Sequence, residues 1–209
     1  MTLKMTVYIG LLAAILLFCG DMILYYDKRD YKSDGTLMPL IEIMKNERAL
    51  RLYIGGMIGP LAAFLYCIGF YHLVLLANPA HATFAWASFL INCLAIIWGG
   101  AYHCYFANLG LIGRHNHKAT LDEVLKFLEI QKNVAFALQG VGFLAMTVMI
   151  ALSWTILPRW MALLTPLVLL LLTPLANRLP KRLHMIICGG WTNLISVIYY
   201  IAVLIIVKQ

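Results

Sequence analysis

Six apolar segments, each about 20 residues long, constrain the fold of this chain more than any other feature. An α-helix rises about 1.5 Å per residue, so about 20 residues cross the roughly 30 Å of hydrocarbon in a bilayer. Of the 209 residues, 63% are hydrophobic and 12% are charged, whereas a soluble domain is about half apolar and a quarter charged. Because so few charges cannot cover a water-facing surface, the sequence predicts an integral membrane protein.

The segments predict an all-α fold, in which residues 1–209 form one transmembrane domain built as a bundle of six transmembrane helices. Each span must be helical, since lipid offers no hydrogen-bond partner to a free backbone amide. In the fifth span, Pro166 and Pro174 remove backbone donors and predict a kinked helix. The predicted spans are 5–26, 51–77, 83–108, 133–156, 160–177 and 184–207.

Two polar connections carry amphipathic patterns that predict short interfacial helices. In the first, Leu37, Leu40, Ile41 and Met44 recur at helical spacing. In the second, the sequence from Thr120 to Glu123 forms a capping box, and apolar residues follow on one helix face up to Leu128. Each helix either lies on the inner leaflet of the membrane or packs on the bundle as an ordinary connection.

Lysine and arginine residues gather in the connections that follow the first, third and fifth spans. Those connections hold thirteen of the sixteen lysines and arginines, and the other ends of the spans hold Lys4, Arg159 and Lys208. By the positive-inside rule, the three charged connections are cytoplasmic and both termini lie outside the cytoplasm. Membrane orientation and anionic headgroups thus explain the net charge of +7 better than nucleic acid does. We predict a multi-pass protein of the cell membrane whose partners are membrane lipids, with no nucleic acid among them.

Asp21 is the only acidic residue inside a predicted span. A carboxylate in hydrocarbon costs roughly 2.5 to 3.5 kcal/mol, so such a residue usually faces a partner or a cavity. The predicted topology places His103, Gln139 and Asn193 at a similar depth, with the aromatic residues Tyr102 and Trp191 near them. The candidate ligand-binding residues are therefore Asp21, Tyr102, His103, Gln139, Trp191 and Asn193.

This polar layer admits two interpretations. It forms either a pocket for a small or lipidic ligand, or a structural clasp that fixes the register of the helices. In the clasp interpretation, Asp21 stays protonated or reaches the membrane interface. If the layer is catalytic, Asp21 and His103 are the candidate acid and base, because each would tune the other's pKa. The sequence therefore leaves open a binding or transport module, an intramembrane lipid-modifying enzyme and an accessory subunit.

No metal site and no cofactor is predicted. The five cysteines lie inside apolar segments without a Cys-x-x-Cys pair, which indicates buried reduced thiols. Haem would need two histidines at one depth on facing helices, whereas His72 and His103 fall on opposite sides of the membrane midplane.

Paired glycines interrupt three of the spans and predict close packing between helices. Two of the pairs belong to a set of short motifs, which are Gly20-Asp21, Gly55-Gly56-Met-Ile-Gly59-Pro60 with Tyr66 and Gly69, Ala101-Tyr102-His103, and Gly189-Gly190-Trp191-Thr-Asn193. This set resembles a bacterial family of small, uncharacterised multi-span membrane proteins, a domain of unknown function. The resemblance implies a six-helix protein of the bacterial inner membrane and assigns no catalytic role to any residue.

Overall fold

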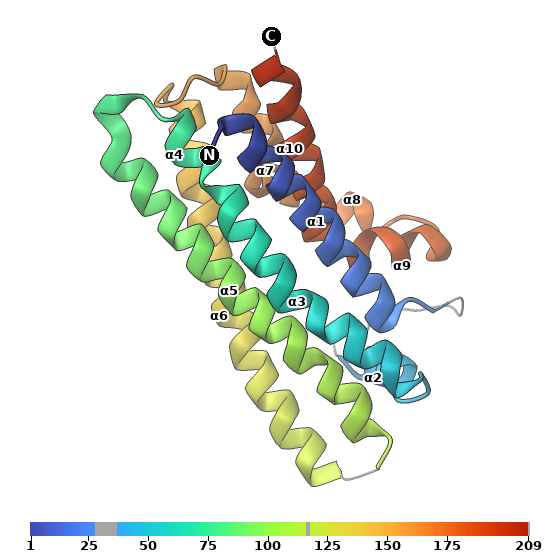
Figure 1. Ribbon diagram of the computed structural model, residues 1–209. Helices are drawn as coiled ribbons and strands as arrows, with labels where there is room; N and C mark the ends of the chain where they lie inside the picture. The colour runs from blue at the N-terminus through green and yellow to red at the C-terminus, as the bar shows by residue number, and fades with distance from the viewer. Residues whose placement is uncertain (28–36, 116–117, 209) are drawn as a thin grey trace.

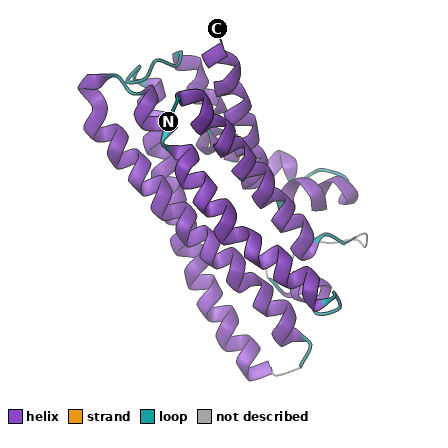
Figure 2. Ribbon diagram, in the orientation of Figure 1, coloured by secondary structure: helices purple, strands orange, loops and turns teal. Residues whose placement is uncertain are grey.

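A computed structural model describes residues 1–27, 37–115 and 118–208 of the chain (Figure 1). Within these residues the chain is helical, and Figure 2 draws helices and loops but no strand. The all-α prediction is therefore confirmed. The elements are α1 (Leu3–Tyr25), α2 (Met38–Met44), α3 (Ala49–Phe70), α4 (His72–Leu76), η1 (Pro79–His81), α5 (Ala82–Gly113), α6 (Lys118–Ala151), η2 (Arg159–Leu164), α7 (Pro166–Leu170), α8 (Thr173–Ala176), α9 (Lys181–Gly189) and α10 (Trp191–Lys208).

Four helical stretches among the described residues are long and apolar enough to cross a membrane. They are Leu3–Tyr25, Ala49–Leu76, Pro79–Gly113 and Lys118–Ala151. A fifth apolar helix, Trp191–Val207, is shorter than these. By length, the described structure thus supports four of the six predicted spans.

The segment predicted as the fifth span, residues 160–177, is three short helices rather than one kinked helix. Pro166 and Pro174 each lie at the start of a helix, in α7 and α8. Proline is tolerated in the first turn of a helix because the amide it lacks has no partner there. The two prolines therefore begin new helices, where the sequence analysis expected them to bend a continuous one.

The segment predicted as the sixth span is divided at Gly190, which separates α9 from α10. Figure 1 shows α9 lying at an angle to α10. Both glycines of the pair also pack closely, as predicted. A Cβ atom on Gly190 would lie 2.2 Å from the Phe18 ring, and one on Gly189 would lie 2.9 Å from the Tyr25 ring.

The second predicted interfacial helix, residues 120–128, is not a separate element. It is the first part of α6, which continues without a break through the predicted start of the fourth span at residue 133. The sequence has no glycine or proline between Lys118 and Gln139, so nothing ends the helix there. The change from charged to apolar residues marked a change of surroundings and not a helix boundary.

The first predicted interfacial helix is α2, and it packs against the bundle. Ile41 and Met44 are almost completely buried. A Cβ atom on Gly110 of α5 would lie 2.7 Å from the Met44 Cβ, and one on Gly113 would lie 3.0 Å from Ile41. The structure therefore favours a connecting helix that packs on α5.

Both termini lie at one end of the bundle, while α2, the last turn of α5 and the first turn of α6 lie at the other (Figure 1). We call these the termini end and the α2 end. Two hydrophobic clusters fill the interior. One contains Leu17, Ala62 and Ile96, and the other contains Leu24, Leu52 and Phe106. On each of α1, α3 and α5, the stretch between the two clusters holds a residue of the predicted polar layer or a glycine that packs next to one.

Candidate functional site

The structure brings three of the predicted site residues into contact. Asn193 Nδ2 of α10 donates a 2.8 Å hydrogen bond to Asp21 Oδ2 of α1. His103 Nε2 of α5 lies 3.3 Å from Asp21 Oδ1, which is within ion-pair distance. Three helices that are distant in sequence therefore meet at one carboxylate, and we call Asp21, His103 and Asn193 the polar triad.

Small residues make room for the His103 ring between α1 and α3. A Cβ atom on Gly59 would lie 2.9 Å from His103 Nδ1 and 2.8 Å from the carbonyl oxygen of Gly100. A Cβ atom on Gly20 would lie 3.2 Å from His103 Cε1. A larger residue at either position would push into the imidazole, so the glycines that permit close helix packing also position His103.

The His103 imidazole is buried and has unused hydrogen-bonding capacity. Only 7% of the residue is exposed. Neither ring nitrogen makes a hydrogen bond within the described residues, so the 3.3 Å contact with Asp21 is electrostatic and lacks hydrogen-bond geometry. A buried polar group left without a hydrogen bond costs about 1–3 kcal/mol, and such groups are often found where a ligand or a reaction needs them.

Tyr66 of α3 extends the triad toward the termini end. Its hydroxyl donates a 3.1 Å hydrogen bond to Asn193 Oδ1, and the residue is 2% exposed. The polar layer proposed from depth did not include Tyr66. A signal was available, because Tyr66 follows Gly59 by seven residues, or two helical turns, and so lies on the same face of α3.

Tyr102 and Trp191 lie beside the triad without a hydrogen bond to it in the described part of the chain. Tyr102 precedes His103 in α5 and packs on Phe106, with ring centroids 5.8 Å apart. The Trp191 indole instead donates a 3.0 Å hydrogen bond to Thr173 Oγ1 of α8. Trp191 therefore ties the start of α10 to the broken fifth segment.

Gln139 lies at a different level from the triad. Asn92 Nδ2 of α5 donates a 3.0 Å hydrogen bond to the carbonyl oxygen of Gly142 of α6, which fixes the register of these antiparallel helices. Gln139 is three residues from Gly142, whereas His103 is eleven residues from Asn92. At about 1.5 Å per residue, Gln139 is therefore about 12 Å from the level of His103 along the helix axis.

The same register places Gln131 of α6 level with His103. Gln131 is 8% exposed, and its Oε1 has no hydrogen-bond partner within the described residues. The sequence analysis missed it because the fourth span was expected to begin at residue 133. Gln131 is thus a second buried polar side chain at this level with unused hydrogen-bonding capacity.

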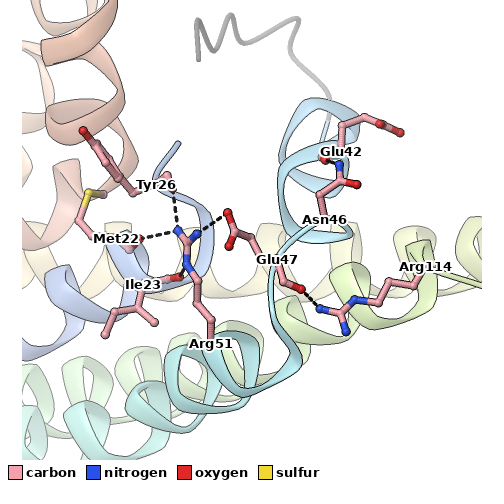
Figure 3. Close-up of polar contacts among 8 residues, drawn as sticks. All are labelled: Met22, Ile23, Tyr26, Glu42, Asn46, Glu47, Arg51 and Arg114. Atoms are coloured by element: carbon pink, nitrogen blue, oxygen red, sulfur yellow. Dashed lines mark hydrogen bonds and ion pairs between the residues drawn. The ribbon is translucent and has the colours of Figure 1, made fainter. Parts of the chain in front are cut away.

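Arg51 of α3 holds the end of α1 just beyond Asp21 (Figure 3). Its guanidinium donates hydrogen bonds of 2.5 Å to the Ile23 carbonyl, 2.6 Å to the Tyr26 carbonyl and 3.4 Å to the Met22 carbonyl. The last carbonyls of a helix lack partners within the helix, and a cation there also stabilises the helix dipole. Arg51 is therefore a side-chain cap that fixes the helix end next to Asp21.

The Arg51 cap is itself anchored. Arg51 forms an ion pair with Glu47, and the Glu47 carbonyl accepts a hydrogen bond from Arg114 at the end of α5 (Figure 3). Through these contacts the ends of α1, α3 and α5 are joined at the α2 end of the bundle.

His72 belongs to a separate polar pair nearer the termini end. Its Nδ1 lies 2.8 Å from the Gly69 carbonyl oxygen, and its Nε2 lies 2.9 Å from the Tyr199 hydroxyl. If Nδ1 carries the proton, it donates to the carbonyl and Nε2 accepts from the tyrosine. Both ring nitrogens are then used, which distinguishes this satisfied histidine from His103.

The comparisons with known proteins agree with the resemblance seen in the sequence. A family model described as "Family of unknown function (DUF6796)" matches residues 1–209. The chain belongs to the DUF6796 family. No curated protein matches the chain, and no solved structure matches it.

Membership in the DUF6796 family assigns no activity to the chain. The chemical groups at the polar triad are therefore the evidence for what the protein can do. The motifs that carried the resemblance supply Gly20, Gly59 and all three residues of the polar triad. Among the residues that the structure describes, no group of three or more His, Cys, Asp or Glu side chains could hold a metal ion. What the site offers is a buried imidazole beside a partly buried carboxylate, with an amide next to them.

Proposed function

We propose that this protein is a multi-pass membrane protein that binds or transports a small or lipidic molecule at the polar triad. The observation that carries the proposal is the buried His103 ring, whose Nε2 lies 3.3 Å from the Asp21 carboxylate and whose two nitrogens make no hydrogen bond within the described part of the chain. A clasp that served only to fix helix register would be expected to satisfy its own hydrogen bonds. A ligand with a polar head could bond to His103 and Asp21 together.

The helix break next to the triad supports a binding role. The chain leaves helical conformation at Gly190, and α10 begins at Trp191, two residues before Asn193. In membrane proteins, irregular backbone at the depth of the bilayer is tolerated where it is buried in protein or lines a cavity. Transporters commonly bind substrates at such interrupted helices, where the positive end of a helix dipole faces anionic groups.

The proposed orientation has the α2 end in the cytoplasm and both termini outside. It is supported by the lysines and arginines of the three charged connections and by the position of the two termini at the same end of the bundle (Figure 1). A bacterial inner membrane fits this arrangement. The triad would then lie in the cytoplasmic half of the bundle, in contact with ligands that arrive from the inner leaflet or the cytoplasm.

An intramembrane lipid-modifying enzyme is the second candidate, and the Asp21–His103 contact favours it specifically. A carboxylate beside an imidazole can hold the ring in one tautomer and stabilise its protonated form, as a general acid–base pair requires. In this role His103 would transfer the proton and Asp21 would orient it. An accessory subunit remains the third candidate, in which the triad is purely structural.

The test compares wild type with Asp21→Asn in detergent, with and without a lipid extract of the host. A ligand at one hundred times its Kd stabilises the folded state by about 2.7 kcal/mol. For a chain of this size we therefore expect the Tm of the wild type to rise by about 5–10 °C, and the Tm of Asp21→Asn to stay unchanged. The exposed Asp122→Asn is the matched control and should respond as wild type does.

Two other outcomes separate the alternatives. If the extract shifts the Tm of wild type and Asp21→Asn equally, or shifts neither, the binding proposal is wrong and the triad is a clasp. If mass spectrometry shows that wild type converts a lipid of the extract and Asp21→Asn does not, the enzyme is the better description.

A further inference from the structure

Cys67 of α3 and Cys93 of α5 form a pair of facing thiols outside the polar triad. Cys67 Sγ lies 4.0 Å from the carbonyl oxygen of Cys93, and Cys93 Sγ lies 3.9 Å from the carbonyl oxygen of Cys67. Both cysteines are free thiols in the structure.

The packing of α3 on α5 accounts for this arrangement. Gly59 and Gly100 bring the two helix backbones together, since a Cβ on either one would lie within 3.0 Å of the other's carbonyl oxygen. Continuing that antiparallel register by about two turns brings Cys67 opposite Cys93. The thiols therefore face each other at a close helix crossing.

The dithiol lies where lipid-soluble molecules can reach it. Both side chains are partly buried and pack against the hydrophobic cluster that contains Leu17, Ala62 and Ile96. Cys93 follows the start of α5 at Ala82 by eleven residues, or about 16 Å, which is near the middle of a bilayer. An oxidant dissolved in the hydrocarbon would meet this pair more readily than one dissolved in water.

Three aromatic rings lie one to two helical turns from the dithiol, toward the start of α5. Tyr71 follows Cys67 by four residues, and Phe89 precedes Cys93 by four residues, so each shares a helix face with its cysteine. The Tyr71, Trp86 and Phe89 rings pack together with centroids 5.6–5.8 Å apart. The rings meet at interplanar angles of 57–79°, and Trp86 is 44% exposed, so its indole is the part of the cluster that is accessible from outside.

We propose that Cys67 and Cys93 form a redox-active dithiol that a lipid-soluble quinone oxidises to an interhelical disulfide. In this step both S–H bonds break and one S–S bond forms between the two Sγ atoms. The two electrons and two protons pass to the two carbonyl oxygens of the quinone, which becomes a hydroquinone. The exposed Trp86 indole stacks on the planar quinone ring, on the side of the dithiol toward the start of α5. The inference rests on the proposed membrane location and not on the ligand at the triad.

The experiment uses the full chain in lipid nanodiscs, treated with decylubiquinone under exclusion of air. The expected product has lost two hydrogen atoms, and peptide mass spectrometry finds Cys67 linked to Cys93 while Cys19 and Cys104 still react with maleimide. Cys67→Ser and, as a second variant, Cys93→Ala should form no link. A wild-type dithiol that stays reduced, or a link that involves any other cysteine, overturns the proposal.

Trp86→Leu tests the quinone part separately from the reactivity of the thiols. Loss of one stacking surface should slow oxidation by decylubiquinone about three- to tenfold, while oxidation by diamide, which needs no stacking surface, changes less than about twofold. Equal slowing with both oxidants, or no slowing with decylubiquinone, shows that the aromatic cluster does not bind quinone. Failure of this test leaves the lipid-extract result at Asp21 unaffected, so the two proposals can be refuted independently.

Discussion

Replacing Gly69 by alanine should weaken the contact between α1 and α3. A Cβ atom at residue 69 would lie 2.5 Å from the Cα of Gly10 and 2.9 Å from its backbone nitrogen. Nonbonded carbon atoms are most favourably separated by about 3.5–4.0 Å. Because the obstructing atoms belong to the backbone of α1 and not to a flexible side chain, α1 and α3 must move apart by about 1 Å.

The size of the effect follows from two opposing contributions. Overpacking of a well-packed interior costs about 1–3 kcal/mol, and contact with backbone favours the upper end of that range. Alanine gains about 0.8–1.0 kcal/mol over glycine in a helix interior. The net expectation is a loss of about 2 kcal/mol in the free energy of unfolding, measured by titration of mixed micelles with sodium dodecyl sulfate.

Gly140→Ala is the matched control for this measurement. Gly140 lies inside α6, and a Cβ atom there would meet nothing within 4 Å. Without overpacking, only the helix propensity remains, so this variant should gain up to about 1 kcal/mol. If Gly69→Ala and Gly140→Ala had the same stability, the inference that Gly69 is required by close backbone packing would be refuted.

Two further variants test individual polar contacts with the same titration. Arg51→Met removes the cap on α1. Because the Arg51 side chain is 27% exposed, we expect the free energy of unfolding to fall by about 1–2 kcal/mol. The control Arg48→Met, at an exposed residue, should change it by less than about 0.5 kcal/mol, and equal losses in the two variants would argue against the cap. Tyr66→Phe removes the buried hydrogen bond to Asn193 and should lose about 1–2 kcal/mol. Tyr8→Phe, at a residue 48% exposed, should be neutral, and a neutral Tyr66→Phe would show that the bond contributes nothing.

The sequence predicted the four long helices because their signal is strong and local. Each has an apolar segment of span length, and helical structure is the only way to satisfy its backbone in lipid. The 160–177 and 184–207 segments are equally apolar, yet the structure breaks both. Hydropathy measures the surroundings of a residue and not its backbone conformation. Proline is also ambiguous, because Pro166 could either kink a helix or begin one.

The shared depth of Asp21 and His103 was predictable, but the depth of Gln139 and the helix face that each residue occupies were not. Asp21 and His103 were singled out because charged or ionisable side chains are rare inside apolar segments, and topology alone put them at one level. Gln139 was grouped with them by the same argument. Its position depended on where α6 begins, and the helix starts fifteen residues before the predicted span. Which face each residue occupies depends on glycine contacts between helices, and these pairings cannot be identified from one sequence.

The two halves of the molecule differ in how they are built, and the triad joins them. Helices α1, α3 and α5 contact one another backbone to backbone at Gly10 and Gly69 and at Gly59 and Gly100. Residues 159–208 instead form short helices that end in α10. Two polar groups of the triad come from the tightly packed half, whereas Asn193 comes from the segmented half. Because Asn193 donates to Asp21 of α1 and accepts from Tyr66 of α3, its side-chain amide is the polar link that joins α10 to the tightly packed half at the level of the triad.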